Sequence, residues 1–435
     1  MALSNIDTFV DTLDRCALTQ VQLRKLQWGL KSILNSNHFY KSKLAAAGIQ
    51  TPQDIDSFET YHQLPFTTKA ELVADQETNP PYGSNLTYPQ EKYSRIHQTS
   101  GTTGLPLQML DTEESWDWWA RCWKRIYQAA GISSNDRIFF AFSFGPFIGF
   151  WSAYAGARLL GSLSIPGGGM SSIQRLKAML THKVTVLICT PTYALHLAEV
   201  AEEEGIDIAN SSIRTTIHAG EPGAGLPATK RRIEDAWGAK CFDHAGATEV
   251  GAWGFQCEGY EGLYVNEGEF IFEIIDPETG KQADEGELVM SNLGRIGMPV
   301  IRYRTGDHVK LSKEPYKSGI TFRKLDGGVT GRVDDVIFVR GINVYPSAIE
   351  NIIRHYSQVG EFAVDIFRRH ELDDMEIRLE INPDAHATDT CTTVAKAIRN
   401  GLGLRVILKP VPAGTLPRFD LKARRFNDHR DKETI

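Results

Sequence analysis

The sequence predicts an α/β fold in two domains, and three observations carry that prediction. The chain has 435 residues, 42% of them hydrophobic, which is more than one ordinary core usually spans. Its middle alternates near-continuous apolar runs with helical patterns, as parallel strands and their crossover helices do. After residue 332 it mixes short strands with helices, which is typical of a small α+β unit.

The first part of the chain, to about residue 80, is predicted to be a helical scaffold. The stretches IDTFVDTLDRC and VQLRKLQWGLKSIL place apolar residues three and four apart, the spacing of one helix face. The stretch TTKAELVADQ begins another helix, for which we expect Thr67 or Thr68 to be the N-cap.

The middle of the chain is predicted to hold buried parallel strands. The runs DRIFFAFSF and VTVLICT are rich in β-branched and aromatic residues, and each is followed by a helical pattern. IRTTIHAGEP supplies a further strand that ends in a glycine loop. From residue 263 to 325 the pattern changes: EFIFEIIDPETGKQADEGELVMSNL contains two strand-like runs joined by a turn, which indicates antiparallel pairing.

The boundary between the two domains is predicted at Arg332, giving domains of residues 1–332 and 333–435. Past this point the expected strands lie in DVIFVRG, FAVDIFR, EIRLEI and RVILKPV. The expected helices lie in PSAIENIIRHY and TVAKAIRNGL.

Composition and charge exclude several classes of partner. A net charge of −7 and a pI near 6.0 argue against nucleic acid. No run approaches the roughly 20 apolar residues of a membrane span, and the first residues do not resemble a signal peptide. The six cysteines are scattered, which favours free thiols and a cytoplasmic protein.

The stretch HQTSGTTGLPLQ is rich in small hydrogen-bonding residues. Glycines let backbone N–H groups converge on an anion, and interleaved hydroxyls add donors to the same oxygens. The tract therefore predicts a phosphate site. It is not a Walker loop, because Leu105 and Pro106 stand where that loop needs Lys and Ser or Thr.

Three further segments point to a nucleotide, although each alone reads as an ordinary turn or helix start. In HAGATEVGAWG, Thr248 and Glu249 pair a hydroxyl with a carboxylate, which suits phosphate and Mg²⁺. In IRYRTGDHVKL, Asp307 follows a strand-like run, where a carboxylate can accept from a ribose diol. In GRVDDVIFVRG, Arg332 can contact ribose or phosphate.

In chain order, TSGTTGLP, GEP, GATE, YRTGD, GRVDD and LPRFDLKARR resemble the motifs of the adenylate-forming superfamily. That superfamily contains acyl-CoA synthetases, peptide-synthetase adenylation domains and luciferases. PVIRYRTGD and GRVDDVIFVRGINVYPSAIE are similar to its phenylacetate-CoA ligase branch, which also holds synthetases that adenylate a deazaflavin coenzyme. The resemblance implies a large adenylate-forming domain, made of α/β subdomains and a small β-rich subdomain, and a small mobile C-terminal domain.

The resemblance implies a two-step reaction that uses ATP, Mg²⁺ and coenzyme A. A carboxylic acid, expected to be aromatic, forms an acyl-adenylate, and a thiol then displaces AMP. By the resemblance, Lys422 is the catalytic lysine of the first step, Thr248 contacts the α-phosphate and Glu249 binds Mg²⁺. The acceptor stays open between coenzyme A, an amine, a carrier-protein thiol and a deazaflavin. A nucleotide-binding protein without catalysis is a further alternative, and relatives in this superfamily often form homodimers.

The same resemblance assigns the remaining contacts of the nucleotide. The β- and γ-phosphates are held by Thr99, Ser100, Gly101, Thr102, Thr103 and Gly104. The backbone of Gly220, Glu221 and Pro222 lies against the adenine. Asp307 takes the ribose hydroxyls, Arg332 supports ribose or phosphate, and Asp334 is the hinge between the domains.

Three departures weaken the match locally. In the segment His244, Ala245 and Gly246, expected at the adenine, Ala245 stands where relatives stack a tyrosine. His244 either helps there or is a buried, hydrogen-bonded histidine. Leu421 replaces the glycine before Lys422, and Leu105 replaces a phosphate-directed lysine.

Aromatic residues after the first parallel strand are candidates for an acyl pocket. They are Phe144, Phe147, Trp151 and Tyr154, and packing in the core is the alternative for each. For Trp116, Trp119 and Trp123, at helical spacing, the core is favoured. Cys241, His244 and Cys257 leave a structural zinc open, although no fourth ligand is evident.

Overall fold

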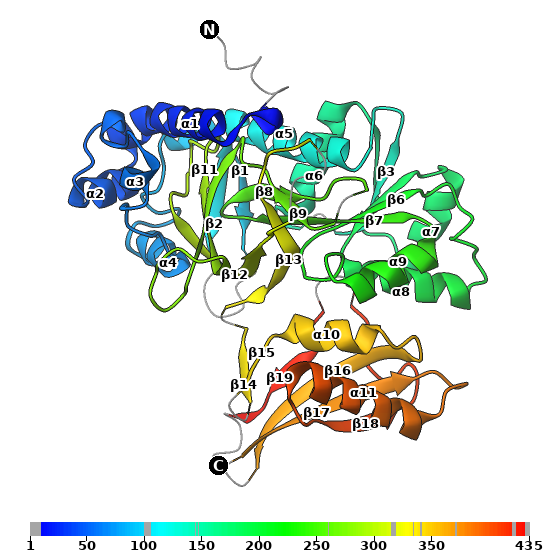
Figure 1. The fold of residues 1–435 in the computed structure, drawn as a ribbon. Helices are drawn as coiled ribbons and strands as arrows, with labels where there is room; N and C mark the ends of the chain where they lie inside the picture. The colour runs from blue at the N-terminus through cyan, green and yellow to red at the C-terminus, as the bar shows by residue number, and fades with distance from the viewer. Residues whose placement is uncertain are drawn as a thin grey trace.

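The computed structural model consists of a large part and a smaller part that is joined to it from below in the view of Figure 1. The structure describes residues 10–99, 106–143, 145–146, 148–259, 261–314, 319–333, 335–339, 342–369, 372–419 and 423–430. None of the helices in these ranges combines the length and apolar content that crossing a bilayer requires.

The centre of the large part is a sheet with eleven strands in the described residues. Their order is β10-β11-β12-β13-β9-β8-β7-β6-β5-β3-β4. The strands on the parallel side are β3 (Arg137–Phe140), β4 (Leu163–Pro166), β5 (Val186–Cys189), β6 (Thr215–His218) and β7 (Lys240–Ala247). Those on the antiparallel side are β8 (Gly251–Phe255), β9 (Leu263–Val265), β10 (Phe270–Ile275), β11 (Glu285–Asn292), β12 (Tyr303–Leu311) and β13 (Lys324–Arg332).

The parallel half alternates strands with helices, as the sequence predicts. The helices are α6 (Gly149–Leu160), α7 (Ser172–Thr181), α8 (Pro191–Glu203) and α9 (Pro227–Trp237). Local chemistry fixes their ends: Thr190 caps α8, with Pro191 as its first residue, and left-handed Gly161 ends α6. The predicted strands in DRIFFAFSF, VTVLICT and IRTTIHAGEP are confirmed as β3, β5 and β6.

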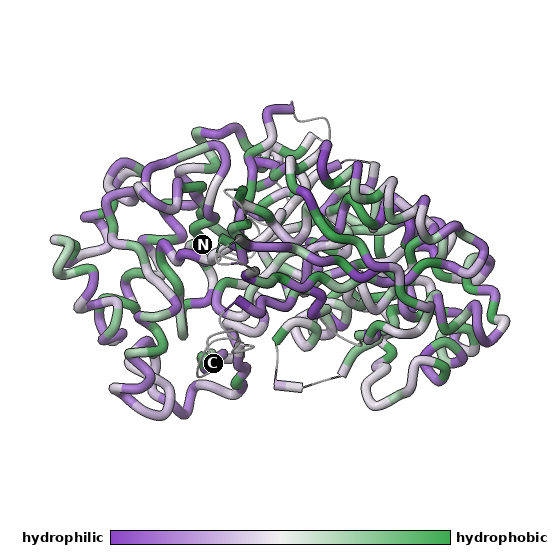
Figure 2. The backbone as a smooth tube through the Cα atoms, turned by 90° about the horizontal axis from the view of Figure 1, so that it is seen from below, coloured by the Kyte–Doolittle hydropathy of each residue, from purple (hydrophilic) through white to green (hydrophobic). Residues whose placement is uncertain are grey.

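The antiparallel half confirms the hairpin predicted for residues 269–293. Strands β10 and β11 pair antiparallel with Phe270 opposite Asn292. Strand β10 is buried along its whole length, because Ile271 packs with the N-terminal helices on one face and Phe270 packs against Trp118 on the other. Figure 2 shows hydrophobic stretches along the tube in the interior of the large part.

The N-terminal region is mostly helical, as predicted for VQLRKLQWGLKSIL. The helix expected over IDTFVDTLDRC is wrong for its described part, because Val10–Thr12 form a 3-10 turn and Asp14 caps a helix that begins only at Arg15. Its helices are α1 (Arg15–Ser36), α2 (His38–Ala46), α3 (Phe58–Tyr61) and α4 (Lys69–Thr78). Thr68 is the N-cap of α4, and its hydroxyl and the Glu71 carboxylate form a capping box. A two-stranded sheet follows, with β1 (Tyr93–Gln98) antiparallel to β2 (Gln108–Thr112).

Helix α5 (Glu113–Ala129) carries the tryptophan cluster into the core. Trp116, Trp119 and Trp123 are 9%, 2% and 1% exposed. The prediction that they pack as core residues is therefore confirmed.

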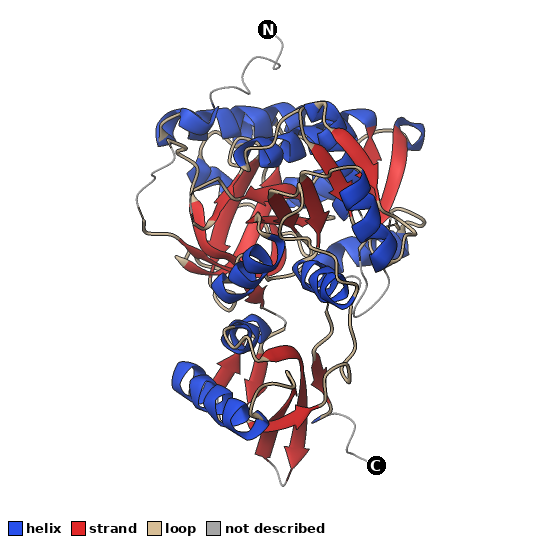
Figure 3. Ribbon diagram, turned by 90° about the vertical axis from the view of Figure 1, so that its right-hand side faces the viewer, coloured by secondary structure: helices blue, strands red, loops and turns tan. Residues whose placement is uncertain are grey.

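The small part is an α+β unit. Its strands are β14 (Ile337–Val339), β15 (Ile342–Val344), β16 (Val359–Arg369), β17 (Leu372–Ile381), β18 (Ile407–Val411) and β19 (Phe426–Asp428). Its helices α10 (Pro346–Arg354) and α11 (Ala387–Leu402) cover one face of the sheet β18-β17-β16-β19 (Figure 3). Strand β13 ends at Arg332 and β14 begins at Ile337, so the predicted boundary between residues 332 and 333 falls in the connection; the two-domain division there stays a prediction.

Candidate functional site

Of the predicted site residues that the structure describes, Gly220, Thr248 and Glu249 lie at the carboxyl edge of the parallel strands, where α/β proteins bind ligands. The chain turns at Gly220 just after β6, with a φ of +98° that favours glycine. Thr248 and Glu249 follow directly after β7, in the turn before β8. Thr190 follows β5 and opens α8 beside them.

The turn of Thr248 and Glu249 is held from behind by a buried ion pair that the sequence did not reveal. The Arg295 guanidinium donates to both Asp111 carboxylate oxygens at 2.8 and 2.7 Å, and both side chains are fully buried. Its Nη1 also donates to the carbonyl oxygens of Thr248, at 2.6 Å, and Glu249, at 3.3 Å. The pair therefore fixes the backbone that presents the predicted catalytic hydroxyl and carboxylate.

The Glu249 side chain is 10% exposed, yet no guanidinium pairs with it within the described chain. Its Oε1 accepts from the Tyr303 hydroxyl at 3.2 Å and lies 3.7 Å from Lys69 Nζ. Burial and the Glu249 charge raise the pKa of Tyr303 well above its usual range, so that hydroxyl stays a donor. Mg²⁺ accepts one or two protein carboxylates together with phosphate oxygens, and the Glu249 carboxylate fits that metal.

Asp307 and Arg332 lie opposite each other on neighbouring strands β12 and β13. Arg332 Nη1 is 3.5 Å from Asp307 Oδ1, and it donates to the Thr305 carbonyl at 3.4 Å. The structure thus brings together two residues that the sequence predicts for the ribose. Asp334 lies outside the described residues.

Glu221 connects the large part to the small part. Its Oε1 accepts from the Thr192 N–H of α8 at 3.0 Å, and its Oε2 accepts from the Ala423 N–H at 2.8 Å. Burial raises the pKa of Glu221, and the two backbone donors oppose that rise. Ala423 is the next residue in the chain after Lys422, which itself lies outside the described residues.

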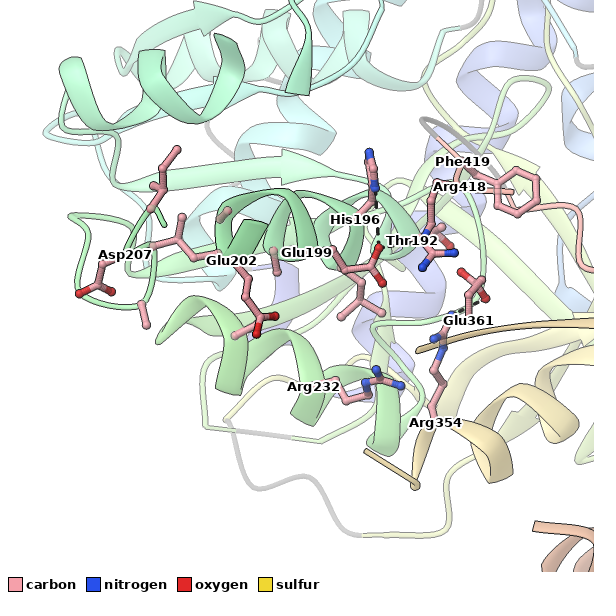
Figure 4. Close-up of a pocket in the computed structure, with 17 residues that line it drawn as sticks. Thr192, His196, Glu199, Glu202, Asp207, Arg232, Arg354, Glu361, Arg418 and Phe419 are labelled. Carbon is pink, nitrogen blue, oxygen red and sulfur yellow. Dashed lines mark hydrogen bonds and ion pairs between the residues drawn. The ribbon is translucent and has the colours of Figure 1, made fainter. Parts of the chain in front are cut away.

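Two arginines of the C-terminal segment contact α8 on either side of that point. Arg418 donates to Glu199 at 2.8 Å, and the buried Arg425 donates to the Thr192 hydroxyl at 3.4 Å while paired with Glu361. A cavity of about 350 Å³ lies between helices α8 and α9 on one side and Arg354, Glu361 and Arg418 on the other (Figure 4). The small domain is therefore docked on the large one by polar contacts around a hollow.

The predicted phosphate tract is described only at its beginning. Thr99 is buried, and its hydroxyl accepts from the Leu107 N–H at 3.2 Å. Its backbone N–H donates to the Leu107 carbonyl at 3.1 Å, which closes the base of the loop. The rest of the predicted tract lies outside the described residues: Ser100, Gly101, Thr102, Thr103 and Gly104.

The predicted adenine segment on β7 places the His244 ring in the core and pairs Ala245 and Gly246 with β8. The His244 ring lies 4.3 Å from the Trp123 ring, and its Nδ1 is 2.7 Å from the Gly254 carbonyl oxygen. Burial lowers the pKa of His244 to about 4, so the ring is neutral and Nδ1 donates. This favours the buried, hydrogen-bonded histidine of the two alternatives. Ala245 is opposite Gly254 and Gly246 opposite Ala252 in the pairing of β7 with β8.

Asp243 is a further buried carboxyl at this edge that sequence reasoning missed. Burial raises the pKa of Asp243 from 3.8 to about 7. Its Oδ2 lies so close to Gly225 and Gly328 that a Cβ on either residue would come within 2.8 to 2.9 Å. In the sequence, the only signal for Asp243 is that a polar residue stands at the end of a strand.

The predicted acyl pocket is described in part. Trp151 is 40% exposed, and its indole N–H donates to the Gly145 carbonyl at 3.0 Å. The Tyr154 ring lies 5.3 Å from the Phe140 ring at the margin of the core. Phe144 and Phe147 lie outside the described residues.

Among the described residues, the structure does not bring together a ligand set for the structural zinc that the sequence left open. Cys241, His244 and Cys257 are all described and buried, and no three His, Cys, Asp or Glu side chains in the described ranges are grouped to hold a metal. Burial raises the pKa of Cys241 above its usual range and that of Cys257 to about 11, so both are neutral thiols.

Comparison with known proteins matches both parts of the chain. A family model described as "AMP-binding enzyme" matches residues 36–295, and one described as "AMP-binding enzyme C-terminal domain" matches residues 341–430. A phenylacetate-coenzyme A ligase of Pseudomonas putida is 31% identical over 97% of this chain and 96% of that protein.

One ligase has been solved in two states, and the two structures resemble this chain to different degrees. 2-Hydroxyisobutyryl-CoA ligase in the postadenylation state, in complex with 2-HIB-AMP, has a TM-score of 0.92 at 29% identity and covers 98% of this chain and 92% of that chain. The same ligase with 2-HIB-AMP and CoA in the thioesterification state has a TM-score of 0.73 at 30% identity, covering 97% and 92%. The two parts of the present chain are therefore arranged as in the postadenylation structure, and the chain belongs to the family of AMP-binding enzymes.

Proposed function

We propose that the protein is an ATP-dependent carboxylic acid–CoA ligase that forms an acyl-AMP and then a CoA thioester. One observation carries the proposal furthest: the Glu221 carboxylate holds the backbone beside Lys422 at the sheet edge where Thr248 and Glu249 lie. A protein that only bound a nucleotide would have no use for a lysine segment brought to that edge. Family membership and the near full-length similarity to phenylacetate-coenzyme A ligases support the same reaction.

In the first step a carboxylate oxygen of the acid attacks the α-phosphorus of ATP, and the bond to the β-phosphate oxygen breaks. Two anions must meet, so the site has to supply positive charge and donors. We assign the β- and γ-phosphates to the tract from Thr99 to Gly104, and the α-phosphate to Thr248 and Lys422. The lysine ammonium is a point charge with three donors, suited to bridge the two reacting anions.

We assign Mg²⁺ to Glu249 and the phosphate oxygens. When bound, the metal neutralises charge that develops on the leaving pyrophosphate. The ion pair of Arg295 with Asp111 supports this role, because it fixes the Glu249 carbonyl and so the position of the carboxylate.

The nucleoside is assigned to the loops on either side of β7. The backbone of Gly220, Glu221 and Pro222 borders the adenine, together with the segment from His244 to Gly246. Asp307 accepts from the ribose diol while Arg332 orients that carboxylate, which their 3.5 Å approach supports. Asp243, close to Gly225 and Gly328, adds an acceptor for the exocyclic amine of adenine.

In the second step the sulfur of CoA attacks the acyl carbon, the bond from that carbon to the phosphate oxygen breaks, and AMP leaves. We propose that the small domain rotates about Asp334 between the two steps. The different likeness to the two states of 2-hydroxyisobutyryl-CoA ligase supports a rotation of this kind.

The class of acid, the cellular compartment and the oligomeric state are further parts of the proposal. We propose a small aromatic acid, in line with phenylacetate-coenzyme A ligases among the relatives. We propose a cytoplasmic enzyme that forms a homodimer. The free cysteines in the described residues support a reducing compartment.

Acid-dependent exchange of pyrophosphate into ATP tests the proposal, run over a panel of aromatic, aliphatic and amino acids. Four acceptors are then supplied in turn: CoA, an amine, a carrier-protein thiol and a deazaflavin. The products are identified by mass spectrometry. We expect exchange with one class of acid and a thioester with CoA. Another acceptor product would replace the CoA assignment, and ATP binding without exchange would indicate a nucleotide-binding protein without catalysis.

A further inference from the structure

A second hollow opens farther along the same edge of the sheet, next to the residues assigned to the nucleotide. It measures about 500 Å³ and lies beyond the ends of β3 and β4. It is lined by Ser143, Gly169, Met170, Ser171, Ser172, Arg175 and Tyr193. Arg175 is the only charged residue among them.

Arg175 is held rigidly at the bottom of this hollow. Its side chain and backbone together are 5% exposed, its Nε donates to the Gly167 carbonyl at 3.0 Å, and its guanidinium lies 5.0 Å from the centre of the Tyr193 ring. The Tyr193 hydroxyl is in turn 3.0 Å from the Ser172 hydroxyl. In the described parts of the chain, the two terminal nitrogens of Arg175 have no protein acceptor.

The other buried arginines of the described chain all have a carboxylate partner. Arg295 pairs with Asp111, Arg302 with Glu273, and Arg354 and Arg425 with Glu361. Arg175 is the exception in the ranges that the structure covers. An unpaired buried cation is costly, and an anion in the hollow would offset that cost.

Helix α7 adds to the attraction for an anion. Ser171 is its N-cap, Ser172 is its first residue, and Arg175 lies on the same helix; all three line the hollow. The positive end of the helix dipole therefore faces the hollow. The fork of a guanidinium matches a carboxylate or phosphate with two parallel hydrogen bonds.

We infer that this hollow binds an anionic group, a carboxylate or a phosphate, through Arg175. The inference rests on the proposed function and deepens it. Tyr193 directly follows Thr192, which donates to Glu221, so the hollow adjoins the proposed adenylation site. A distal carboxylate on the acid substrate is the source we favour, and a phosphate of CoA is the other.

The test compares Arg175→Gln with Arg137→Gln. Arg137 is the matched control because its Nε also donates to a backbone carbonyl, that of Lys183, but at the opposite end of β3. Pyrophosphate exchange is measured for pairs of acids that differ by one distal carboxylate, such as phenylacetate and 4-carboxyphenylacetate, or hexanoate and adipate. Thioester formation is measured with CoA and with CoA lacking its 3′-phosphate.

We expect Arg175→Gln to lower kcat/KM for the dicarboxylic member of a pair about 10- to 100-fold and to spare the monocarboxylic member, since a hydrogen-bonded charge is lost. Arg175→Lys, which keeps the charge but not the fork, should fall between. If Arg175→Gln lowered thioester formation with CoA but not with CoA lacking its 3′-phosphate, the anion site would be supported and assigned to CoA. Equal effects on both members of every pair and on both forms of CoA, or effects matched by Arg137→Gln, would overturn the inference.

A binding measurement separates this inference from the proposed function. Calorimetric titration with adipate, CoA and dephosphorylated CoA needs neither ATP nor turnover. Tighter binding of adipate or CoA to the wild type than to Arg175→Gln supports the anion site even if no acid gives exchange. Identical isotherms for the two proteins overturn it even if exchange is found.

Discussion

Asp243 and Glu221 are two carboxyl groups at the same edge of the central sheet, each in surroundings that disfavour its charge. Burial raises the pKa of both, to about 7 for Asp243. Hydrogen bonds from Thr192 and Ala423 oppose the rise at Glu221, and the His244 backbone and the charge of Lys230 oppose it at Asp243, whose Oδ2 lies close to Gly225 and Gly328. Glu221 thus joins two segments of the chain, whereas Asp243 is the carboxyl group that we assign to the adenine.

Asp243 predicts a pH dependence of stability in the protein without ligands. Its folded pKa lies above its unfolded value, so the folded state binds the proton more tightly, and stability falls as the pH rises from about 4 to 7. Urea unfolding at pH 5, 6, 7 and 8 should show this slope in the difference between wild type and Asp243→Asn. Asp207→Asn, at an exposed carboxyl with a lowered pKa, is the control, and a difference that does not vary with pH would contradict the assignment.

Lys422 predicts a kinetic effect without loss of the nucleotide. Lys422→Ala should lower acid-dependent pyrophosphate exchange about 10²- to 10³-fold, the usual cost of a lost donor to a developing charge. ATP affinity should stay near that of the wild type, because other residues hold the nucleotide. Lys396→Ala, on the exposed face of α11, is the control, and unchanged exchange in Lys422→Ala would remove that lysine from the mechanism.

At the scale of elements, the turn after β7 is held by residues from two distant segments. Asp111 lies on β2 and Arg295 follows β11, and together they fix the carbonyls of Thr248 and Glu249. Arg295→Met should cost about 3–5 kcal/mol of unfolding free energy, because it leaves a buried carboxylate unpaired. Denaturant unfolding measures this, with Arg137→Met, at a half-buried arginine without a carboxylate partner in the described residues, as control. A loss below about 1 kcal/mol by that measure would show that the pair is not structural.

The contact of Glu221 with Ala423 predicts a split between the two half-reactions. Glu221→Gln can satisfy only one of the two N–H donors, so exchange should fall about 10- to 100-fold. Thioester formation from supplied acyl-AMP should stay within about twofold, because that step needs the contact broken. Glu234→Gln, a carboxylate that accepts from the Cys241 N–H inside the large domain, is the matched control. Equal losses in both half-reactions would indicate a merely structural role.

Sequence patterns predicted elements well where the local signal decides them. Apolar runs identified β3 and β5, and the hydroxyl and carboxylate around Thr68 marked the start of α4. They did not predict β4 or the polar β7, KCFDHAGA, because those strands form by pairing with neighbours. Arg295 with Asp111, and Glu221 with Ala423, were missed because each pair joins residues far apart in the chain.

At the scale of the whole molecule, the two domains meet through polar contacts around a hollow. Arg418 with Glu199, Arg232 with the Val359 carbonyl, and Glu221 with Ala423 join them. Contacts of this kind can be exchanged for water at little cost, unlike a large apolar interface. The polar character of the interface is therefore compatible with the rotation that we propose for the small domain.

Isotope transfer tests the central claim, an acyl-AMP intermediate, most directly. The acid that supports exchange is labelled with ¹⁸O in its carboxylate and turned over with ATP and CoA. The label is then followed by mass spectrometry in AMP, pyrophosphate and thioester. The account predicts one labelled oxygen in AMP and none in pyrophosphate, because the carboxylate oxygen that attacks the α-phosphorus leaves with AMP. Unlabelled AMP, or label in phosphate together with ADP, would contradict it.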